Sequence, residues 1–414
     1  MDTEKMGIAA KSAARVLGMA STNSKNKALE AMAAALEVNA ASIISANEAD
    51  LDNGKQNGMR DSLLDRLRLT PERIAGMADG IRQVAALADP IGEIIEGSVR
   101  PNGMKIQRVR VPLGVVGIIF EARPNVTSDA AALCLKSGNA CILRGGKEAI
   151  HSNMAIAKIL REAVASAGLP ADCIQLVSDT SRESANQMMR MSKYLDVLIP
   201  RGGAGLIRAV VKNSTVPVIE TGVGNCHVYV DKSADIPMAA NIIFNAKTSR
   251  PSVCNAIETI LIHRDIAQEA LPVIKARLDE KNVELRGCDR TRAILGDSVV
   301  PATDEDYATE FSDYILACRV VDSLEQAIEH IAKYSTGHSE CIVTSDYFSA
   351  ELFTSAVDSA AVYVNCSTRF TDGGEFGLGA EIGISTQKLH ARGPMGIRQL
   401  TSSKFIIQGD GQIR

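Results

Sequence analysis

The chain has 414 residues, of which 46% are hydrophobic and 23% charged, and its formal net charge at pH 7 is -4. This length exceeds one ordinary hydrophobic core and predicts two domains, and the ordinary globular mixture argues against disorder. Because the charge is small and negative and no long basic block occurs, nucleic acid and anionic membranes are unfavourable partners, and a small-molecule enzyme is favoured.

The first part of the chain has the pattern of helices. From about residue 5 to residue 88, alanine, leucine and isoleucine recur at spacings of three and four, and Thr70-Pro71 is expected to open the last helix. Two strands are then expected, Ile91–Glu96 and Met104–Val111, joined by a turn at Pro101-Asn102-Gly103. The alternation of the second strand slips at Arg108, which predicts a bulge there.

From Gly114 onward, predicted strands alternate with predicted helices, which is typical of a mostly parallel sheet covered on both faces. We therefore predict two α/β units in tandem, ended by a short strand at Lys404–Ile407. The strands expected in the first unit are Val115–Ile119, Ala140–Leu143, Ile174–Val177, Leu195–Ile199 and Val216–Ile219. The second unit is expected to contain a helix at Ile236–Lys247 and another that ends near Glu280. Its other expected elements are Ala256–Ile262, Val283–Arg286, Leu324–Tyr334, Cys341–Thr344 and Ala361–Asn365.

Two glycine-bearing turns join a strand to a helix in the first unit. They contain Arg144-Gly145-Gly146-Lys147 and Arg201-Gly202-Gly203-Ala204-Gly205. Backbone amides at a helix start favour a phosphate, but neither turn matches a P-loop or a dinucleotide fingerprint. Taken alone, each turn is equally well interpreted as an ordinary strand-to-helix connection or as a nucleotide site. Because both turns carry an arginine, the pair favours an anionic ligand.

Cys254 is the best-placed candidate nucleophile among the nine cysteines. It lies four residues after Arg250, where a helical pattern breaks at Pro251 just before an apolar strand. A thiol attacks as the thiolate, which requires partial exposure and nearby positive charge, and Arg250 and Lys247 are the expected sources of that charge. An ordinary loop cysteine is the alternative interpretation, and Cys226 is the next candidate nucleophile.

Other site classes and locations are disfavoured by the sequence. The cysteines include no C-x-x-C pair, which argues against a disulfide framework or structural zinc, and the six histidines show no ligand spacing, so we expect no metal. The amino terminus resembles neither a signal nor a transit peptide. The longest nearly apolar run, Val111 to Phe120, is far shorter than a membrane span. We expect a soluble, cytoplasmic protein.

Six blocks of the chain together resemble the gamma-glutamyl phosphate reductase family, also called glutamate-5-semialdehyde dehydrogenases, within the aldehyde dehydrogenase superfamily. The resemblance runs along nearly the whole chain, and several blocks are family-specific. The blocks are Phe120–Thr127, Cys141–Glu148, Leu198–Gly205, Asn245–Asn255, Tyr363–Glu381 and Ser385–Gly396.

The resemblance implies an α/β aldehyde dehydrogenase-like fold with a Rossmann-like cofactor domain, a catalytic domain and a small oligomerising β element. Residues 1–221 would form the NADPH-binding domain, which bridging or oligomerisation strands interrupt near residues 100–125. Residues 222–375 would form the catalytic domain. Residues 376–414 would form a C-terminal bridging or oligomerisation segment. The family reduces L-glutamyl 5-phosphate with NADPH to glutamate 5-semialdehyde and releases phosphate, the second step of proline biosynthesis. A homo-oligomer and functional coupling to glutamate 5-kinase are also implied.

The same resemblance implies roles for individual residues. Cys254 would be the nucleophile. Asn125 would donate a hydrogen bond to the oxyanion, and the alternative interpretation of Asn125 is an ordinary turn residue after Pro124. Glu220 lies near the water-activating glutamate of aldehyde-oxidising relatives and would be at best auxiliary in a reductase. The implied cofactor-binding residues are Arg144, Lys147, Gly202, Gly203 and Glu310. The implied substrate-binding residues, each with a structural salt bridge as its alternative, are Arg123, Arg250, Arg369 and Arg392.

Two rival functions remain at this stage. A hydrolytic aldehyde dehydrogenase would form carboxylates with NAD and would require Glu220. A non-catalytic relative would keep the fold alone, although the intact block around Cys254 argues against it.

Overall fold

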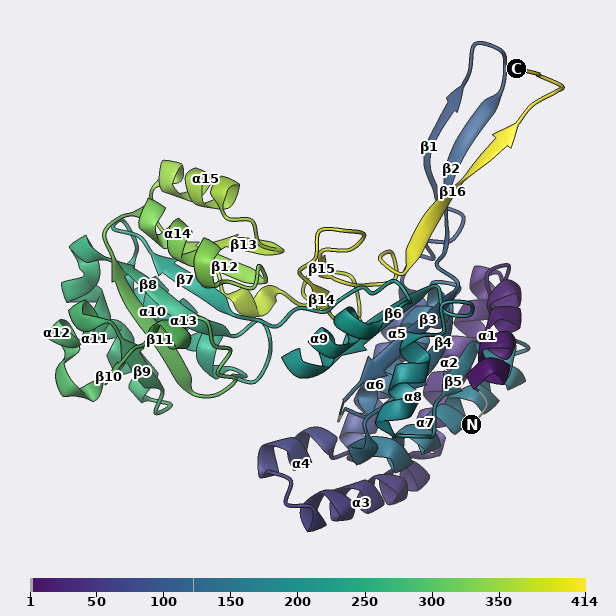
Figure 1. Cartoon of the computed structure of the whole chain (residues 1–414), viewed down its shortest axis with the longest axis horizontal. Helices are drawn as coiled ribbons and strands as arrows, with labels where there is room; N and C mark the ends of the chain where they lie inside the picture. The colour runs from purple at the N-terminus through teal and green to yellow at the C-terminus, as the bar shows by residue number, and fades with distance from the viewer. Residues whose placement is uncertain (1–2, 122) are drawn as a thin grey trace. The chain divides into compact units, whose positions relative to one another are not determined.

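The computed structural model describes residues 3–121 and 123–414 and divides into two compact units (Figure 1). The first unit comprises Met1–Thr221, Gly377–Gly383 and Pro394–Arg414, and the second comprises Gly222–Phe376 and Ile384–Gly393. Outside the described residues lie the first two positions of the predicted domain 1–221 and Ala122 of the Phe120–Thr127 block.

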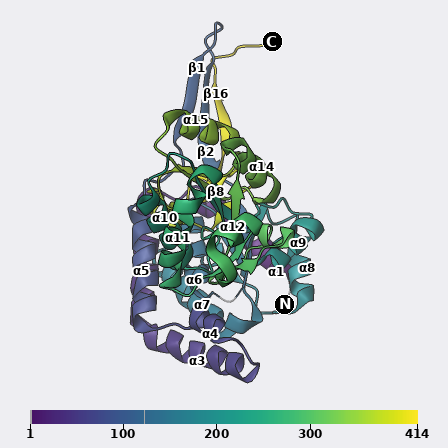
Figure 2. The same cartoon turned by 90° about the vertical axis from the view of Figure 1, so that its left-hand side faces the viewer.

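Five helices begin the first unit, as the apolar spacing predicted. They are α1 (Thr3–Leu17), α2 (Thr22–Val38), α3 (Ala40–Gln56), α4 (Asp61–Leu67) and α5 (Pro71–Ala86). The predicted start of α5 is confirmed, because the Thr70 hydroxyl accepts the N–H of Arg73 and Pro71 is the first helical residue. Helices α3 and α4 lie at the end of this unit opposite the antiparallel strands of residues 94–112 and 401–408 (Figures 1 and 2).

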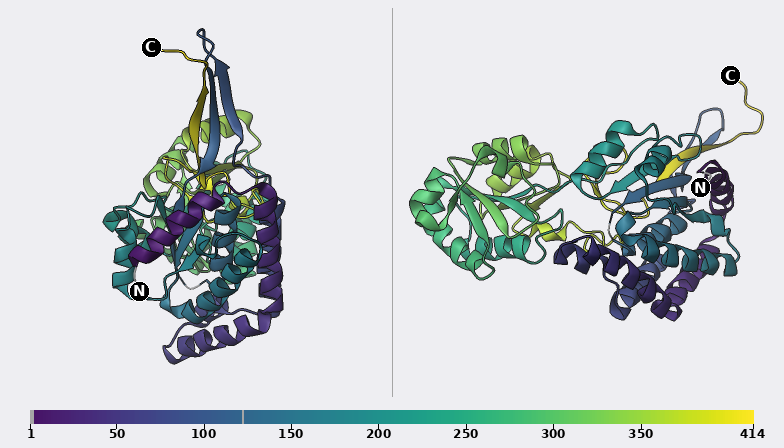
Figure 3. Two further views of the ribbon diagram at one scale, coloured as in Figure 1. Left: turned by 90° about the vertical axis from the view of Figure 1, so that its right-hand side faces the viewer. Right: turned by 60° about the horizontal axis from the view of Figure 1, so that its bottom comes forward.

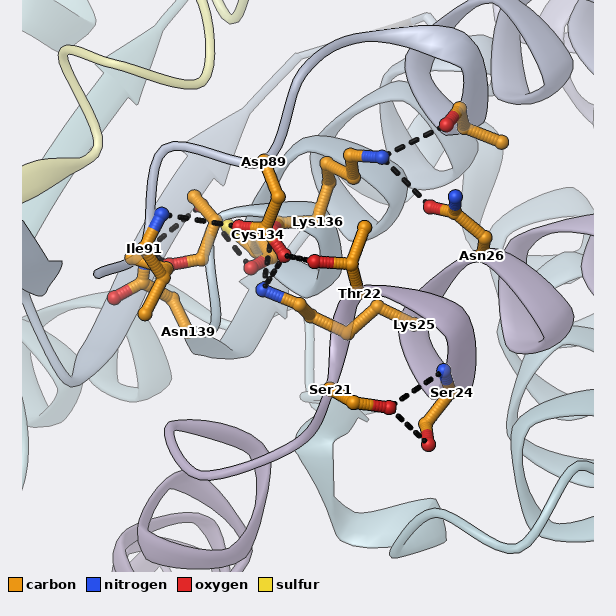
Figure 4. Close-up of polar contacts among 12 residues, drawn as sticks. Ser21, Thr22, Ser24, Lys25, Asn26, Asp89, Ile91, Cys134, Lys136 and Asn139 are labelled. Atoms are coloured by element: carbon orange, nitrogen blue, oxygen red, sulfur yellow. Dashed lines mark hydrogen bonds and ion pairs between the residues drawn. The ribbon is translucent and has the colours of Figure 1, made fainter. Parts of the chain in front are cut away.

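Two buried lysines, Lys25 and Lys136, connect α2 and α5 with the segment after α5 and with the helix that ends at Lys136 (Figure 4). The Lys25 ammonium lies 2.5 Å from an Asp89 carboxylate oxygen, and their side chains are 1% and 8% exposed. Lys25 also donates to the Lys136 carbonyl oxygen at 3.1 Å. The Lys136 ammonium donates to the Asn26 side-chain oxygen at 2.6 Å and to the Ala85 carbonyl at 2.7 Å. Each buried cation is therefore hydrogen-bonded, as burial requires.

A four-stranded parallel sheet of order β5-β4-β3-β6 forms the centre of the first unit. Most of the predicted alternation is confirmed, but Val216–Ile219 is not a strand: only Val218 forms a bridge, to Leu198. Pro217 in this segment has no N–H to give to a ladder. The elements are β3 (Val115–Phe120), α6 (Asn125–Lys136), β4 (Ala140–Arg144), η1 (Lys147–Ala149), α7 (Ile150–Ser166), η2 (Ala171–Cys173), β5 (Ile174–Leu176), α8 (Arg182–Met189), β6 (Val197–Arg201) and α9 (Ala204–Asn213).

A three-stranded antiparallel arm projects from this unit (Figures 1 and 3). Its order is β1 (Ile94–Val99), β2 (Lys105–Pro112), β16 (Thr401–Gln408). The predicted bulge lies beside Arg108, but the extra residue belongs to β1, where Ile94 pairs with Val109 and Glu96 with Arg108. The register between β2 and β16 is continuous, so the bulge predicted near Arg108 is confirmed in its position, with the extra residue on β1.

A seven-stranded parallel sheet of order β10-β9-β11-β8-β7-β12-β13 forms the second unit. Neighbouring residues of one strand enter different cores: Val228 packs on the face covered by α10 and α11, and Tyr229 on the face of α14 and α15. Helices thus cover both faces, as predicted. Strands β7 and β11 lie in segments for which no strand was predicted.

The elements of this unit begin with β7 (Cys226–Val230), α10 (Ile236–Thr248), β8 (Ile257–His263), α11 (Arg264–Asp279), β9 (Glu284–Gly287), α12 (Asp289–Leu295), η3 (Gly296–Ser298) and β10 (Val300–Pro301). They continue with α13 (Asp304–Tyr307), β11 (Ile315–Val321), α14 (Leu324–Tyr334), β12 (Ser339–Val343), α15 (Tyr347–Ala356), β13 (Ala361–Val364) and η4 (Thr368–Phe370). Short strands β14 (Ile384–Ser385) and β15 (Gly393–Pro394) pair with each other.

Within residues 3–121 and 123–414, no single helix has the length and hydropathy to cross a membrane. Helices α2 and α3 satisfy those criteria only as a pair, and the pair is bent by 67°.

Candidate active site

The predicted nucleophile Cys254 lies in the loop of residues 249–256, between α10 and β8, and its side chain is half-buried. Partial exposure is what a reactive thiol requires. The loop immediately precedes β8, so Cys254 lies at the amino end of a central strand. Gly224 and Glu310 precede β7 and β11, parallel strands of the same sheet. The candidate site of the second unit is therefore built from loops at the amino edge of its sheet.

Gly224 packs its backbone directly against the backbone of Cys254. A Cβ atom at Gly224 would lie 1.5 Å from the Cys254 carbonyl oxygen and 2.3 Å from its carbonyl carbon. Only glycine permits this approach. The same carbonyl accepts a hydrogen bond from the Cys226 thiol, with the sulfur and oxygen 3.2 Å apart. The backbone of the nucleophile loop is thus held by contacts from two residues that flank the start of β7.

Glu310, the predicted ribose-binding carboxylate, is connected to this contact. Its Oε1 accepts the N–H of Gly224 at 3.1 Å. Burial raises the pKa of Glu310, while the Gly224 N–H and then the Lys247 ammonium act in the opposite direction. One hydrogen bond therefore connects the Glu310 carboxylate directly to Gly224, the glycine that packs against the nucleophile loop.

Lys247 does not have the role that the sequence analysis gave it. Its ammonium lies 2.5 Å from Oε2 of Glu258, and both side chains are 0% exposed. The charge of Lys247 is therefore compensated by Glu258 rather than offered to Cys254. Burial raises the pKa of Glu258 to about 7, opposed by Lys247 and by the N–H of Ser312. Burial lowers the pKa of Lys247.

Arg369 is the cation that the structure associates with the thiol, and Arg250 acts on Arg369. The pKa of Arg369 is lowered by burial and then by Arg250, and is raised by Asp372 and Cys254. Arg369 is therefore within electrostatic reach of both Arg250 and Cys254. The Arg369 guanidinium is oriented by hydrogen bonds to Ser249 Oγ, at 2.9 Å, and to the Asn255 side-chain oxygen. Two interacting guanidinium groups, one of them within reach of a thiol, suit an anionic substrate.

The two glycine turns of the first unit approach each other through Glu121. This residue follows β3, and its Oε2 accepts the N–H of Gly203, the N-cap of α9, at 2.8 Å. A Cβ at Gly202 would lie 2.4 Å from the same oxygen. On the other side, a Cβ at Gly146 would lie 3.5 Å from the Glu121 Cα. Both turns thus flank one point at the carboxyl edge of the parallel sheet, where nucleotides bind in such folds.

Arg144 and Lys147 differ in their surroundings. Lys147 begins η1 and is exposed. Arg144 donates to the carbonyl oxygens of Thr180 and Ser181 at 2.6 and 2.9 Å, and burial lowers its pKa. Arg144 therefore also braces the segment before α8, a contact that the sequence did not indicate.

Asn125 is the first residue of α6 rather than a turn residue before it. Its side-chain amide donates to Asp129 Oδ2 at 2.9 Å. Burial raises the pKa of Asp129 to about 6, while the Asn125 amide acts in the opposite direction. The carboxyl group fixes the orientation of the amide, which has a second N–H to donate.

The remaining predicted residues fall in both units. Arg123 and Glu220 belong to the first unit and are half-buried. Arg392 belongs to the second unit, where it is ion-paired with Asp358 at 2.8 Å and donates to the Asp358 carbonyl at 2.7 Å. This pairing supports the structural interpretation of Arg392.

Three residues important to this geometry were missed in the sequence: Glu121, Gly224 and Glu258. Each left a signal, since Glu121 directly follows a buried strand, Gly224 ends a glycine-rich segment and Glu258 interrupts an apolar strand. Their partners are distant in the chain, and no local pattern identifies them. In the part of the chain that the structure describes, no group of three or more His, Cys, Asp or Glu side chains is placed to hold a metal ion.

Known proteins are similar to this chain along its whole length. The aldehyde dehydrogenase family pattern matches residues 1–292. Gamma-glutamyl phosphate reductase of Heliobacterium modesticaldum is 63% identical over 408 residues, covering 99% of this chain and 98% of that protein. The Clostridium novyi enzyme of the same name is 61% identical over 405 residues, covering 98% and 97%. The crystal structure of gamma-glutamyl phosphate reductase from Thermotoga maritima superposes with a TM-score of 0.97 at 50% identity, covering 100% of both chains. This chain therefore belongs to the aldehyde dehydrogenase family and, within it, to the gamma-glutamyl phosphate reductases.

Proposed function

We infer that this chain reduces L-glutamyl 5-phosphate to L-glutamate 5-semialdehyde with NADPH and releases phosphate. Full-length identity of about 60% to gamma-glutamyl phosphate reductases carries this inference. The half-buried Cys254, with Arg369 in electrostatic reach, supports it. The reaction is the second step of proline biosynthesis.

Cys254 performs the covalent chemistry in this proposal. Its thiolate attacks the acyl carbon, the bond from that carbon to the phosphate oxygen breaks, and phosphate leaves with the bonding electrons. NADPH, when bound, supplies the hydride that reduces the resulting thioester to a thiohemiacetal. The thiohemiacetal then loses its proton and expels the Cys254 thiolate, which releases the aldehyde. Each tetrahedral stage carries an oxyanion, for which we propose the second amide N–H of Asn125 and the backbone N–H of Cys254 as donors.

The first unit has features that fit the cofactor. A Cβ at Gly145 would lie 2.1 Å from Asn153 Nδ2, a buried nitrogen that has no hydrogen-bond partner among the described residues. Gly202 and Gly203 form the start of α9, where the Gly203 N–H already binds an anionic group, the Glu121 carboxylate, as helix starts favour. We propose that residues 1–221 bind NADPH and residues 222–375 carry the catalytic loops, with Glu310 as the carboxylate for the nicotinamide ribose. Residues 376–414 would bridge and oligomerise.

Arg144 and Lys147 are proposed to hold the adenosine 2′-phosphate. Replacing both with neutral residues is expected to raise the KM for NADPH much more than the KM for NADH, because only NADPH offers the extra phosphate to charge-assisted hydrogen bonds. Steady-state kinetics with both cofactors measures this. Equal effects on the two cofactors would restrict both residues to shaping the turn and bracing the segment before α8.

Glu220 is expected to be dispensable for the chemistry. A general base supplies about a hundredfold or more where a reaction uses one, but reduction of an acyl phosphate deprotonates no water. Glu220→Gln should therefore reduce kcat by much less than that and should leave the phosphate-dependent reverse reaction largely intact. A loss of roughly a thousandfold with unchanged substrate binding would instead support the hydrolytic function.

We propose that Arg123, Arg250 and Arg369 hold the phosphate and α-carboxylate of the substrate, whereas Arg392 stabilises the fold through Asp358. The decisive assay for the function is reduction of NADP with glutamate 5-semialdehyde, with and without phosphate. Reduction that requires phosphate is expected. Phosphate-independent formation of glutamate would indicate the hydrolytic rival, and no turnover would indicate the non-catalytic one.

We further propose a cytoplasmic homo-oligomer that is functionally coupled to glutamate 5-kinase. The arm exposes apolar side chains on its two outer strands, with Ile94 56%, Val99 67%, Phe405 61% and Ile407 60% exposed. Exposed apolar surface on strand edges is typical of contacts between chains, and a second copy of this chain is the partner proposed. Light scattering of a Phe405→Ser, Ile407→Ser variant should then report a smaller assembly.

A further inference from the structure

The buried ion pair of Lys247 and Glu258 spans the nucleophile loop. Lys247 lies in the last turn of α10 and Glu258 near the start of β8, so the two side chains join the ends of the segment that carries Cys254. Their contact of 2.5 Å is made with both side chains 0% exposed. Replacing such a pair by apolar residues is often neutral or stabilising, so stability alone is a weak reason for two charges in this position.

The second oxygen of Glu258 holds another loop. Its Oε1 accepts the N–H of Ser312 at 3.2 Å, and Ser312 has a φ of 55°, a left-handed conformation that non-glycine residues rarely adopt. A conformation of this kind persists when its surroundings hold it. Ser312 lies two residues after Glu310, whose carboxylate accepts the N–H of Gly224. Gly224 in turn packs against the Cys254 backbone.

We propose that Glu258 is a positioning residue for the reaction: one carboxylate oxygen fixes the Cys254 loop through Lys247, and the other fixes the Glu310 loop through Ser312. The thiol and the ribose-binding carboxylate are thereby held in one arrangement by a single buried side chain. This inference rests on the proposed function, because it assigns Glu310 to the cofactor.

Two double variants separate positioning from stability. Lys247→Met with Glu258→Gln and Lys247→Met with Glu258→Leu both remove the two buried charges, but only glutamine can still accept the Ser312 N–H. The glutamine variant should keep the KM for NADPH within about threefold of wild type, and the leucine variant should raise it about tenfold. Alkylation of Cys254 by iodoacetamide, followed on its peptide by mass spectrometry, should change in rate in both variants, since both lose the contact across the nucleophile loop.

Three controls make the comparison decisive. Asp231→Asn disturbs another buried carboxylate, which follows the opposite end of β7 and accepts from Ser233 and Thr344; it should lower the melting temperature without changing the KM for NADPH. Glu258→Asp keeps the charge balance but has a shorter side chain, so it should also raise the KM for NADPH. This variant replaces the leucine variant in the test if the leucine variant does not fold. Adding Glu310→Gln to the leucine variant should raise the KM no further, because both changes act on one contact.

The outcomes distinguish this proposal from the proposed function. Equal KM values for NADPH in the two double variants, or a fully additive effect of Glu310→Gln, would overturn the positioning role of Glu258. A wild-type protein without phosphate-dependent activity would instead overturn the proposed function. A Glu310→Gln variant with an unchanged KM for NADPH would remove Glu310 from the cofactor site, and the present inference with it.

Discussion

Cys254→Ser is expected to abolish reduction, with kcat lower by ~10³-fold or more, while the affinity for NADPH stays within a few fold. A serine hydroxyl is not ionised at neutral pH, and the ester it would form accepts hydride less readily than a thioester. Cofactor binding uses other residues in our proposal, so it should persist. Single-turnover kinetics and calorimetric NADPH binding on the same preparation measure the two quantities.

Cys366→Ser is the matched control for this prediction, because Cys366 is also half-buried but packs at the end of β13. It should keep near wild-type turnover. If Cys254→Ser also turned over normally, the nucleophile would lie elsewhere. Cys226, the next candidate from the sequence, is a poor substitute, since it is buried and its burial raises the pKa of its thiol well above the ordinary value.

Gly224→Ala is expected to lower kcat by about a hundredfold, although no reacting group is changed. The new Cβ would lie 1.5 Å from the Cys254 carbonyl oxygen and 2.6 Å from its Cα. These are backbone atoms, so relief of the overlap must move the nucleophile loop itself. Overpacking of this kind also costs about 1–3 kcal/mol of stability. Turnover and the melting temperature should be measured together.

Gly80→Ala provides the control for Gly224→Ala. Gly80 lies inside α5, and a Cβ there meets nothing within 4 Å. Alanine should therefore leave activity unchanged and add roughly 0.5–1 kcal/mol of stability, because glycine is the weaker helix former. A Gly224→Ala enzyme with wild-type turnover would show that the loop can move without consequence for the chemistry.

The sequence predicted the parts of the fold that have a local signal. The expected helix at Ile236–Lys247 agrees with α10 to within one residue, and the Thr70-Pro71 pair predicted the start of α5. Strands β7 and β11 were missed, since His227 and Arg319 place polar side chains inside otherwise apolar runs. His227 is buried by pairing with Glu340 across the sheet at 3.0 Å, which a local pattern does not reveal.

The candidate site was predictable as residue types but not as contacts. The nucleophile loop could be recognised from Cys254 and the preceding helix break, whereas the partner of Lys247 could not, because Glu258 lies beyond the loop on another element. The role of Glu121 depends on three parallel strands bringing separate turns to one edge. Such contacts depend on the order of the strands in the sheet, and the spacing of residues along the chain does not reveal that order.

The buried Lys25, Asp89 and Lys136 have a consequence for how the first unit opens. Their bonds join α2, the segment after α5 and the end of α6, so separating any one of these elements would leave an ammonium or carboxylate without its partner inside the protein. Partial opening is therefore penalised more than it would be in an apolar interface. Amide hydrogens in α2 and α6 should exchange with solvent as one cooperative group, protected to a common free energy, while those of exposed segments exchange independently.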